Sequence, residues 1–322
     1  MDEVNKFLIR LYEASREVEL DEFQEHALTL FNGLVPFDLA RWGTTALDER
    51  GAAYQTPWFY KDPPESLQDY NEFREQDTAA VLVLSNPDRT LNFPLADYYS
   101  ESCAGLRAYQ RRYQHAHALI TSHLNRVTGL YDALSTYGAH TNRSFTEAQR
   151  QLTELVFPHL REALRINQSL HVERMRPRAD GYQWAMAICD AAGRLRFVEP
   201  QFTELLLLEW PTGPRQGLPV ELTRIASSTP EARFVGNVVV FCIKVIHQSA
   251  FIRARRRMPV DSLSRRELDV ARQVAAGLTH KEIAKVLRIS PATVRHHIQA
   301  VHERAGVHNN AELATQLRNC GL

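Results

Sequence analysis

Residues 263–307 read LSRRELDVARQVAAGLTHKEIAKVLRISPATVRHHIQAVHERAGV, and this stretch carries the strongest structural signal of the chain. Apolar residues recur at helical spacing over 263–276, and Gly277 is placed to end that helix. Thr279-His-Lys-Glu282 is a capping box, in which the hydroxyl and the carboxylate satisfy backbone N–H groups at a helix start. Ser290-Pro291 begins a third helix, because serine is a good N-cap and proline is tolerated at the first helical position.

A fourth helix follows the third, capped by Asn309 or Asn310 and running to about Arg318. The short second helix and the third helix, joined by a tight turn, are typical of a helix-turn-helix. The exposed face of the third helix carries side chains that donate hydrogen bonds to base edges and phosphates: Arg295, His296, Gln299 and Arg304. The helix N-termini at Thr279 and Ser290 are suited to receive phosphates.

Charge is distributed unevenly along the chain. The 322 residues carry 38 basic and 38 acidic side chains, so the formal net charge is zero. Residues 251–322 hold 13 Lys and Arg against 6 Asp and Glu, a net +7, which leaves −7 on the first 250 residues. A basic end on an acidic body predicts an anionic partner for that end alone, although a solvated surface with chance clustering would give the same count.

The quoted stretch resembles the DNA-binding domain of LuxR-type (GerE-like) bacterial transcription regulators, over about 60 residues. The family pattern runs roughly L-T-x-R-E-x-x-V-L, then A-x-G-x-S/T-N-K-E-I-A, then S-x-x-T-V-K-x-H. The matching residues are Leu263, Arg266, Glu267, Val270, Gly277, Thr279, Lys281, Glu282, Ile283, Ala284, Ser290, Thr293, Val294 and His297. The resemblance implies a regulator that binds double-stranded DNA at a promoter operator.

The resemblance also implies roles for single residues. Base contacts in the major groove fall on Arg295, His296 and Gln299. Phosphate contacts fall on Thr279, Lys281, Ser290, Thr293 and Arg304. Three positions depart from the pattern: His280, a further DNA-contact candidate, replaces an asparagine, Ala305 replaces a leucine, and Asn310 replaces an arginine and puts one phosphate contact in doubt.

The first 170 residues resemble a GAF-like sensor domain. Helices are expected over 3–16 and 21–34, then short strands, a helix over 66–76, a strand or helix turn over 79–84 and a helix near 94–107. Strands over 115–123 and 129–136 precede a long amphipathic helix over 146–169. Phe145-Thr-Glu-Ala-Gln-Arg-Gln-Leu152 and Pro158-His159-Leu160 resemble the start of that helix in such regulators.

The remaining residues are assigned to smaller parts. Residues 171–180 read as a linker, and residues 181–250, with a hairpin, a helix over 200–208 and a strand over 237–248, resemble a PAS-like domain. Residues 251–258 form a basic linker whose arginines either contact phosphate or lie in solvent, and 259–322 is the helix-turn-helix domain. The fold class is therefore multidomain α+β with an all-α C-terminal domain of four helices.

Aromatic residues suggest where a small molecule would bind, because ligand sites combine aromatic walls with a few polar groups. The candidates are Trp42, Tyr54, Trp58, Tyr60, Tyr70 and Asp77. The alternative is that most of these side chains are core. Related sensors of acyl-homoserine lactones carry a spaced Trp, Tyr and Asp with a second Trp, but the spacings differ here, so that ligand is not predicted.

Several other functions have little support. No apolar run reaches about 18 residues and the N-terminus is acidic, so we expect a cytoplasmic protein with no membrane span or signal peptide. The sequence has no phosphate loop or nucleophile elbow, and its scattered cysteines form no metal motif, so we expect no enzyme, no cofactor and no metal site.

The expected partners are duplex DNA, a small-molecule effector, a second copy of the chain and, for an activator, RNA polymerase. A dimer is expected because paired half-sites need two recognition helices. The alternative is a regulator controlled by a protein partner, or by redox chemistry at Cys103, Cys189 or Cys242, instead of a metabolite.

Overall fold

The architecture was obtained as a computed structural model that describes residues 2–126, 129–176, 184–213, 217–247 and 249–320. The chain divides into two units, Met1–Glu173 and Arg174–Leu322. Both units contain a sheet with helices, and the second also contains a helical domain, which confirms the α+β fold class. None of the described helices is both long and apolar enough to cross a membrane.

The first unit is built on a six-stranded antiparallel sheet in the order β2-β1-β6-β5-β4, with β3 beside β1. The strands are β1 Leu39–Asp48, β2 Gly51–Tyr54, β3 Trp58–Tyr60, β4 Thr90–Phe93, β5 His117–Leu124 and β6 Tyr131–Gly138. Register joins Arg41 to Ser135 and Trp42 to Leu134, so neighbouring residues of β1 point to opposite faces of the sheet.

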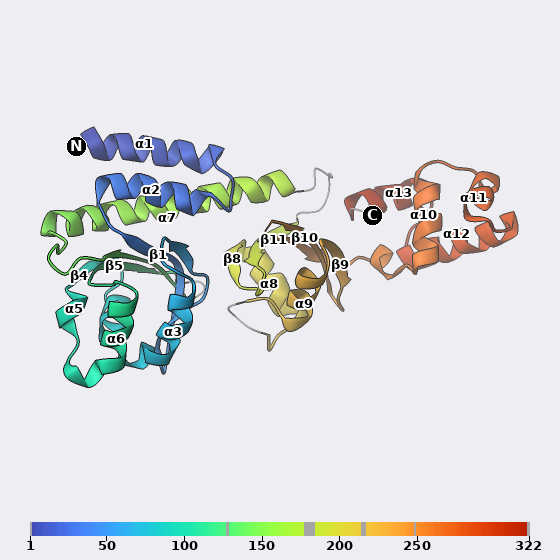
Figure 1. Ribbon diagram of the computed structural model, residues 1–322. Helices are drawn as coiled ribbons and strands as arrows, with labels where there is room; N and C mark the ends of the chain where they lie inside the picture. The colour runs from blue at the N-terminus through green and yellow to red at the C-terminus, as the bar shows by residue number, and fades with distance from the viewer. Residues whose placement is uncertain (1, 127–128, 177–183, 214–216, 248, 321–322) are drawn as a thin grey trace. The chain divides into compact units, whose positions relative to one another are not determined.

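Helices cover both faces of this sheet (Figure 1). Those on one face are α1 Asp2–Glu17, α2 Phe23–Leu34 and α7 Glu147–Met175. Those on the other are α3 Glu65–Phe73, α4 Thr78–Leu84, α5 Leu95–Tyr98 and α6 Ala104–Arg112, with short 3-10 turns at Arg74–Gln76 and Glu101–Cys103. Two separate apolar clusters result, one beneath α1, α2 and α7 and one beneath α3, α4 and α6.

Two predicted segments of this unit differ in the structure, and a third, the strand or helix turn over 79–84, is a helix. Residues 79–84 are the helix α4, because the Asp77 carboxylate caps it by accepting from the N–H of Ala80 at 2.9 Å. The helix predicted near 94–107 is split into α5 and α6, and the strand β4 before it was not predicted. The linker predicted from 171 begins later, because α7 continues to Met175 with His171 and Val172 buried; residues 177–180 lie outside the described residues.

The second unit begins with a five-stranded antiparallel sheet in the order β8-β7-β11-β10-β9. The strands are β7 Ala185–Asp190, β8 Leu195–Val198, β9 Glu231–Val235, β10 Val239–Ile246 and β11 Ser249–Arg256. The helices α8 Pro200–Glu209 and α9 Val220–Ser228 pack on its apolar face. The sequence did not predict α9, β9 or β11, and a PAS-like classification of this sheet stays a prediction.

The basic linker predicted at 251–258 is wrong over most of its length. Residues 251–256 belong to β11, which lies between β7 and β10 at the centre of the sheet. Ala250, Ile252 and Ala254 face the apolar cluster, Arg253 and Arg255 occupy alternate positions, and Arg256 is exposed at the end of the strand. The strand therefore satisfies the period-two pattern of a half-buried strand, and the arginine-rich segment is part of the sheet.

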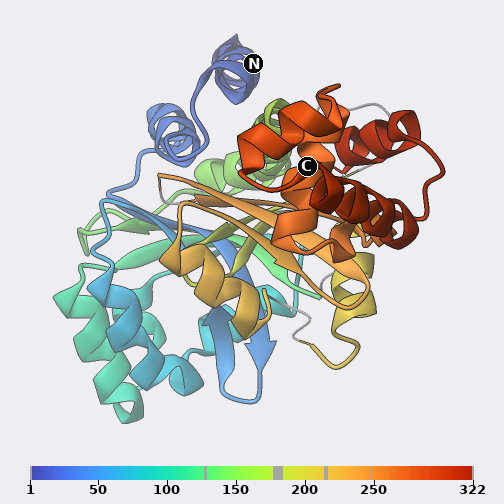
Figure 2. The same cartoon turned by 90° about the vertical axis from the view of Figure 1, so that its right-hand side faces the viewer.

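The C-terminal domain is a bundle of four helices that follow a 3-10 turn at Pro259–Ser262 (Figure 1, Figure 2). The helices are α10 Arg265–Ala275, α11 His280–Leu287, α12 Pro291–Ala305 and α13 Asn310–Asn319. The predicted caps are confirmed: Thr279 and Glu282 form a capping box, Ser290 caps α12 and Asn309 caps α13. A second capping box, Ser264 with Glu267, starts α10 and was not predicted.

A buried ionic group lies in the first unit between the sheet and helices α3 and α6. The Arg41 guanidinium donates from Nε to Asp62 Oδ2 at 2.5 Å and from one terminal nitrogen to Ser66 and Tyr109 at 2.8 and 2.6 Å. The His115 ring lies 3.1 Å from the other oxygen of Asp62 and stacks on Tyr137. Burial in apolar surroundings requires that these charges be paired, as they are here.

The same burial sets the protonation of the group. Burial lowers the pKa of His115 below its ordinary value of 6.5, and the hydrogen bond to Asp62 opposes this only in part. Burial alone would raise the pKa of Asp62, but the bond from His115 and the charge of Arg41 outweigh it and lower the pKa. At neutral pH the group is therefore an ionised Arg41–Asp62 pair beside a neutral imidazole.

We predict that His115 makes the first unit less stable in mild acid. Below about pH 6.5 the unfolded chain binds a proton on His115 that the folded chain does not, so the free energy of unfolding falls by up to about 1.4 kcal/mol per pH unit. Urea unfolding of the wild type at pH 7.5, 6.5 and 5.5 measures this dependence. His115→Gln should flatten it, whereas His26→Gln at an exposed position should leave it unchanged; equal slopes in wild type and His115→Gln would contradict the assignment.

Candidate DNA interface and sensor interior

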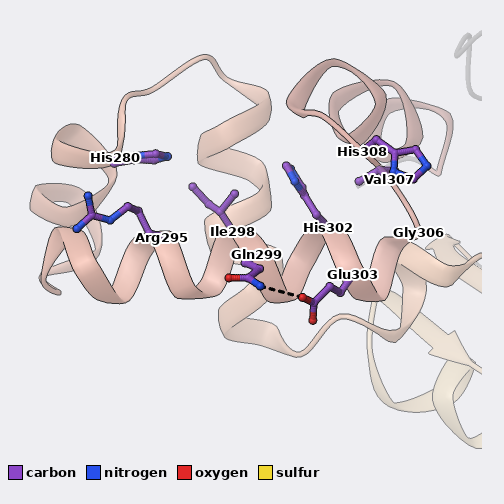
Figure 3. A pocket seen from close by; sticks show the side chains of 9 residues that line it. All are labelled: His280, Arg295, Ile298, Gln299, His302, Glu303, Gly306, Val307 and His308. Carbon is purple, nitrogen blue, oxygen red and sulfur yellow. Dashed lines mark hydrogen bonds between the residues drawn. The ribbon is translucent and has the colours of Figure 1, made fainter.

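The recognition face of α12 borders a surface groove in the C-terminal domain. The groove runs along α12 toward the turn before α13, with His280 at the start of α11 closing one end (Figure 3). Its lining residues are His280, Arg295, Ile298, Gln299, His302, Glu303, Gly306, Val307 and His308. Buried Ile298 and Val307 form an apolar floor, and the polar side chains stand around it.

Two of the three predicted base-reading residues line this groove. Arg295 and Gln299 are exposed and follow one another by one helical turn (Figure 3). His296 is also exposed but does not line the groove. The Gln299 amide donates to Glu303 at 3.1 Å, which leaves its carbonyl oxygen and one N–H for another partner.

Sequence reasoning missed His302, Glu303 and His308 as members of this surface. His302 lies 3.1 Å from the side-chain oxygen of Asn310, so it joins α12 to the start of α13. His302 and Glu303 lie seven and eight residues after Arg295, which puts them on the same face of the helix. Helical spacing counted onward from the family's base-reading positions would have found both.

The predicted phosphate-contact residues have different environments. The Thr279 hydroxyl donates to Glu282 at 2.7 Å, and the Ser290 and Thr293 hydroxyls lie 2.8 Å apart. These hydroxyls therefore hold the helix N-termini, and the exposed Lys281 follows Thr279 by two residues. Each role as a DNA contact stays a prediction.

Arg304 is engaged within the domain. It donates to Glu267 at 2.7 Å while its side chain remains 55 % exposed. Burial alone would raise the pKa of Glu267, but bonds from Ser264 and the charge of Arg304 lower it, so the carboxylate stays ionised. A phosphate would therefore compete with Glu267 for Arg304.

The six ligand candidates of the first unit do not come together. Trp42, Trp58 and Tyr60 pack in the apolar cluster beneath α1, α2 and α7. Tyr54 and Tyr70 belong to the cluster on the opposite face of the sheet, where Tyr70 donates to Asp77 at 2.9 Å. A ligand bound on one face can contact only one of these two sets.

Tyrosines surround the buried arginine on the second face. The guanidinium carbon of Arg41 lies 5.8, 6.0 and 5.7 Å from the ring centres of Tyr54, Tyr70 and Tyr137. We call Arg41, Tyr54, Tyr70, Tyr109 and Tyr137 the tyrosine–arginine cluster. Such distances allow cation–π attraction, which strengthens in a desolvated interior.

Asp77 lies beside this cluster with its oxygens already in use. It accepts hydrogen bonds from Tyr70 at 2.9 Å, Tyr99 at 2.5 Å and the N–H of Ala80 at 2.9 Å. Burial, together with the charge of Asp77, raises the pKa of both phenols, so they stay protonated donors. A new ligand that needs Asp77 as an acceptor would have to displace one of these donors.

The remaining chemical groups have ordinary surroundings. The described cysteines are free thiols, and burial raises the pKa of Cys189 to about 12, which keeps it in the unreactive protonated form. His115 bonds to Asp62 and His117 to the carbonyl of Thr141, so the two histidines have different partners. Across the described part of the chain, no group of three or more His, Cys, Asp and Glu is arranged to hold a metal ion.

Comparison with known proteins identifies the C-terminal domain. A nitrate/nitrite response regulator protein homolog of Haemophilus influenzae is 47 % identical over 51 residues, 16 % of this chain and 24 % of that protein. The transcriptional regulatory protein UhpA of Escherichia coli K12 is 44 % identical over 57 residues, 18 % of this chain and 29 % of that protein. The chain thus matches only about a quarter of the length of these curated relatives.

The comparison with solved structures gives an alignment of low structural similarity. The crystal structure of Escherichia coli SdiA aligns over 99 % of this chain and 98 % of its own, with 16 % identity and a TM-score of 0.39. The family model of bacterial regulatory proteins of the luxR family matches residues 261–317, which cover α10, α11, α12 and most of α13. Residues 261–317 are therefore a GerE domain of the luxR family.

Proposed function

We propose that this chain is a cytoplasmic LuxR-type transcription regulator that binds an operator in duplex DNA as a homodimer and responds to a small-molecule effector through residues 1–173. The observation that carries the proposal is the exposed face of α12 in a domain that matches the luxR family. On that face, Arg295, His296 and Gln299 present side chains that hydrogen-bond to base edges in the major groove.

The charge distribution supports DNA as the partner of the C-terminal end only. Residues 251–322 carry +7 and the first 250 residues carry −7. Attraction to a phosphate backbone is long-range and depends on salt, so it draws the basic end toward DNA and repels the acidic body. The protein is thereby oriented before any base is read.

A homodimer fits the geometry of helix-turn-helix recognition, in which paired half-sites need two copies of α12. The surfaces we propose for dimerisation are α7 and α13. In sequence, α7 is the last helix of the first unit and α13 is the last helix of the GerE domain. Contact with RNA polymerase follows if the regulator activates transcription.

For the effector, we propose the tyrosine–arginine cluster as the binding region. The ring of Tyr137 is buried beside Arg41, and we propose that its hydroxyl contacts the ligand. Arg41 is neutralised by Asp62, which favours a ligand without a full negative charge. An effector changes DNA binding only if its affinity differs between the competent and incompetent arrangements of the chain.

Arg295→Ala is expected to weaken the binding of a selected operator by about 1–3 kcal/mol and to relax the base preference at one position. Lys281→Ala is expected to weaken all duplexes alike and to lower the slope of log affinity against log salt by about one, because it removes one phosphate contact. Fluorescence anisotropy with selected and scrambled duplexes at several salt concentrations distinguishes the two. If Arg295→Ala lowered the affinity for both duplexes equally, Arg295 would be a phosphate contact and the base-reading assignment would fail.

Tyr137→Phe tests the effector region by removing one hydroxyl. Native mass spectrometry of the purified full-length chain should show an extra small mass that is absent after denaturation, or a metabolite extract should raise its melting temperature. Tyr137→Phe should weaken that binding about 2- to 10-fold, the usual value of one hydrogen bond. Tyr60→Phe, the same change on the opposite face of the sheet, should leave it unchanged; equal effects, or neither an extra mass nor a thermal shift in the wild type, would overturn the assignment.

A further inference from the structure

The second unit also contains a buried ionic group, at the junction between β11 and the GerE domain. Arg255 of β11 is 2 % exposed and binds Asp261 with both ends of its guanidinium, at 2.6 and 2.7 Å. The Asp261 side chain is fully buried. This is the two-bond geometry that makes arginine–carboxylate pairs both strong and directional.

Further bonds tie three segments of chain to this pair. Arg233 of β9 donates to the same carboxylate, and so does the N–H of Met258 at 2.7 Å. Arg255 also donates to the carbonyl of Cys320, just beyond the end of α13, at 3.2 Å. The group therefore joins two strands of the sheet to both the beginning and the end of the GerE domain.

An indole lies against the same arginine. The guanidinium carbons of Arg253 and Arg255 each lie 4.9 Å from the ring centre of Trp184. Trp184 is 2 % exposed and directly precedes β7. The Trp184 ring therefore packs on Arg255, the arginine that binds Asp261.

The Asp261 carboxylate is ionised as well as buried. Burial would raise the pKa of Asp261, but the hydrogen bonds from Arg255 and Met258 outweigh it and lower the pKa, so the carboxylate is charged. A buried charge without its partner is strongly unfavourable, so a partly opened pair is a poor intermediate. Loss of either partner would therefore leave a buried charge unpaired.

We propose that Arg233, Arg255 and Asp261 form a latch that fixes the orientation of the GerE domain on the sheet of residues 185–256 and thereby sets the half-site spacing that the dimer reads. This inference rests on the proposed DNA-binding function. With the latch closed, each α12 is carried rigidly by its sheet. With the latch open, the GerE domain changes its orientation on the sheet more freely, and each α12 reads its half-site independently of spacing.

The test uses the full-length chain and a duplex that the wild type selects from a random pool, with a second duplex that has five base pairs inserted between the half-sites and a third that has one half-site. The insertion turns one half-site by about half a helical turn. The wild type should bind the inserted duplex more than about 20-fold more weakly, and Asp261→Asn and Arg255→Gln less than about 3-fold more weakly. Both variants should bind the single half-site within about twofold of the wild type, which also shows that their GerE domains are folded.

Asp269→Asn is the matched control, because it removes an equal charge from α10 without touching the latch. It should keep the spacing preference of the wild type. Latch variants that also keep that preference would overturn the proposal, as would a wild type that binds the inserted and selected duplexes equally.

A second measurement separates failure of the latch from failure of the proposed function. In hydrogen-exchange mass spectrometry of the free chain, Asp261→Asn should speed exchange of the amides of 258–263 by more than about tenfold, because a neutral amide no longer forms the ion pair with Arg255 that holds this segment on β11. Arg256→Gln, at an exposed neighbouring position, should not. If the wild type selects no operator, the proposed function fails and exchange alone decides on the latch; unchanged exchange in Asp261→Asn overturns the latch whatever the DNA result.

Discussion

A guanidinium removed from water needs a carboxylate beside it, and each unit of this chain contains such a buried pair. In the first unit, Arg41 of β1 meets Asp62. This pair fixes the register of β1, because a slip by one residue would turn Arg41 toward the apolar helices α1, α2 and α7 and Trp42 toward the polar side. The same register places Arg41 on the face of the sheet where Tyr54, Tyr70 and Tyr137 surround it.

Local signals made the GerE domain predictable. Its helix starts are marked by capping residues that lie within three positions of the groups they satisfy, as Thr279 with Glu282 and Asn309 with the N–H of Glu312. Its apolar residues repeat at helical spacing within one element. Neither signal depends on which distant segment packs against the helix, so a single sequence suffices to read it.

The strands of the two sheets were harder to predict, because they depend on contacts between segments that are distant in the sequence. The arginines of β11 suggested a linker that either contacts phosphate or lies in solvent, although Arg253 and Arg255 alternate with Ile252 and Ala254 as in a strand. Arg255 is stable there only because Asp261, Trp184 and the carbonyl of Cys320 reach it from other segments. The same limit affected the ligand candidates: Trp42 and Tyr70 both look like pocket residues, and only the pairing of strands shows that they lie on opposite faces.

The two buried pairs differ in where their carboxylates come from. Asp62 belongs to the same unit's interior as Arg41, so opening that pair disrupts the core that contains it. Asp261 stands at the start of the DNA-binding domain, and its second donor, Arg233, is 29 % exposed, so water can reach this group from one side. Typical coupling between sites is about 1–3 kcal/mol, far less than the cost of stranding two charges in an apolar interior. A coupling free energy of this size can open an ion pair only if water solvates both charges as they separate. Of the two pairs, only the one at Asp261 meets this condition.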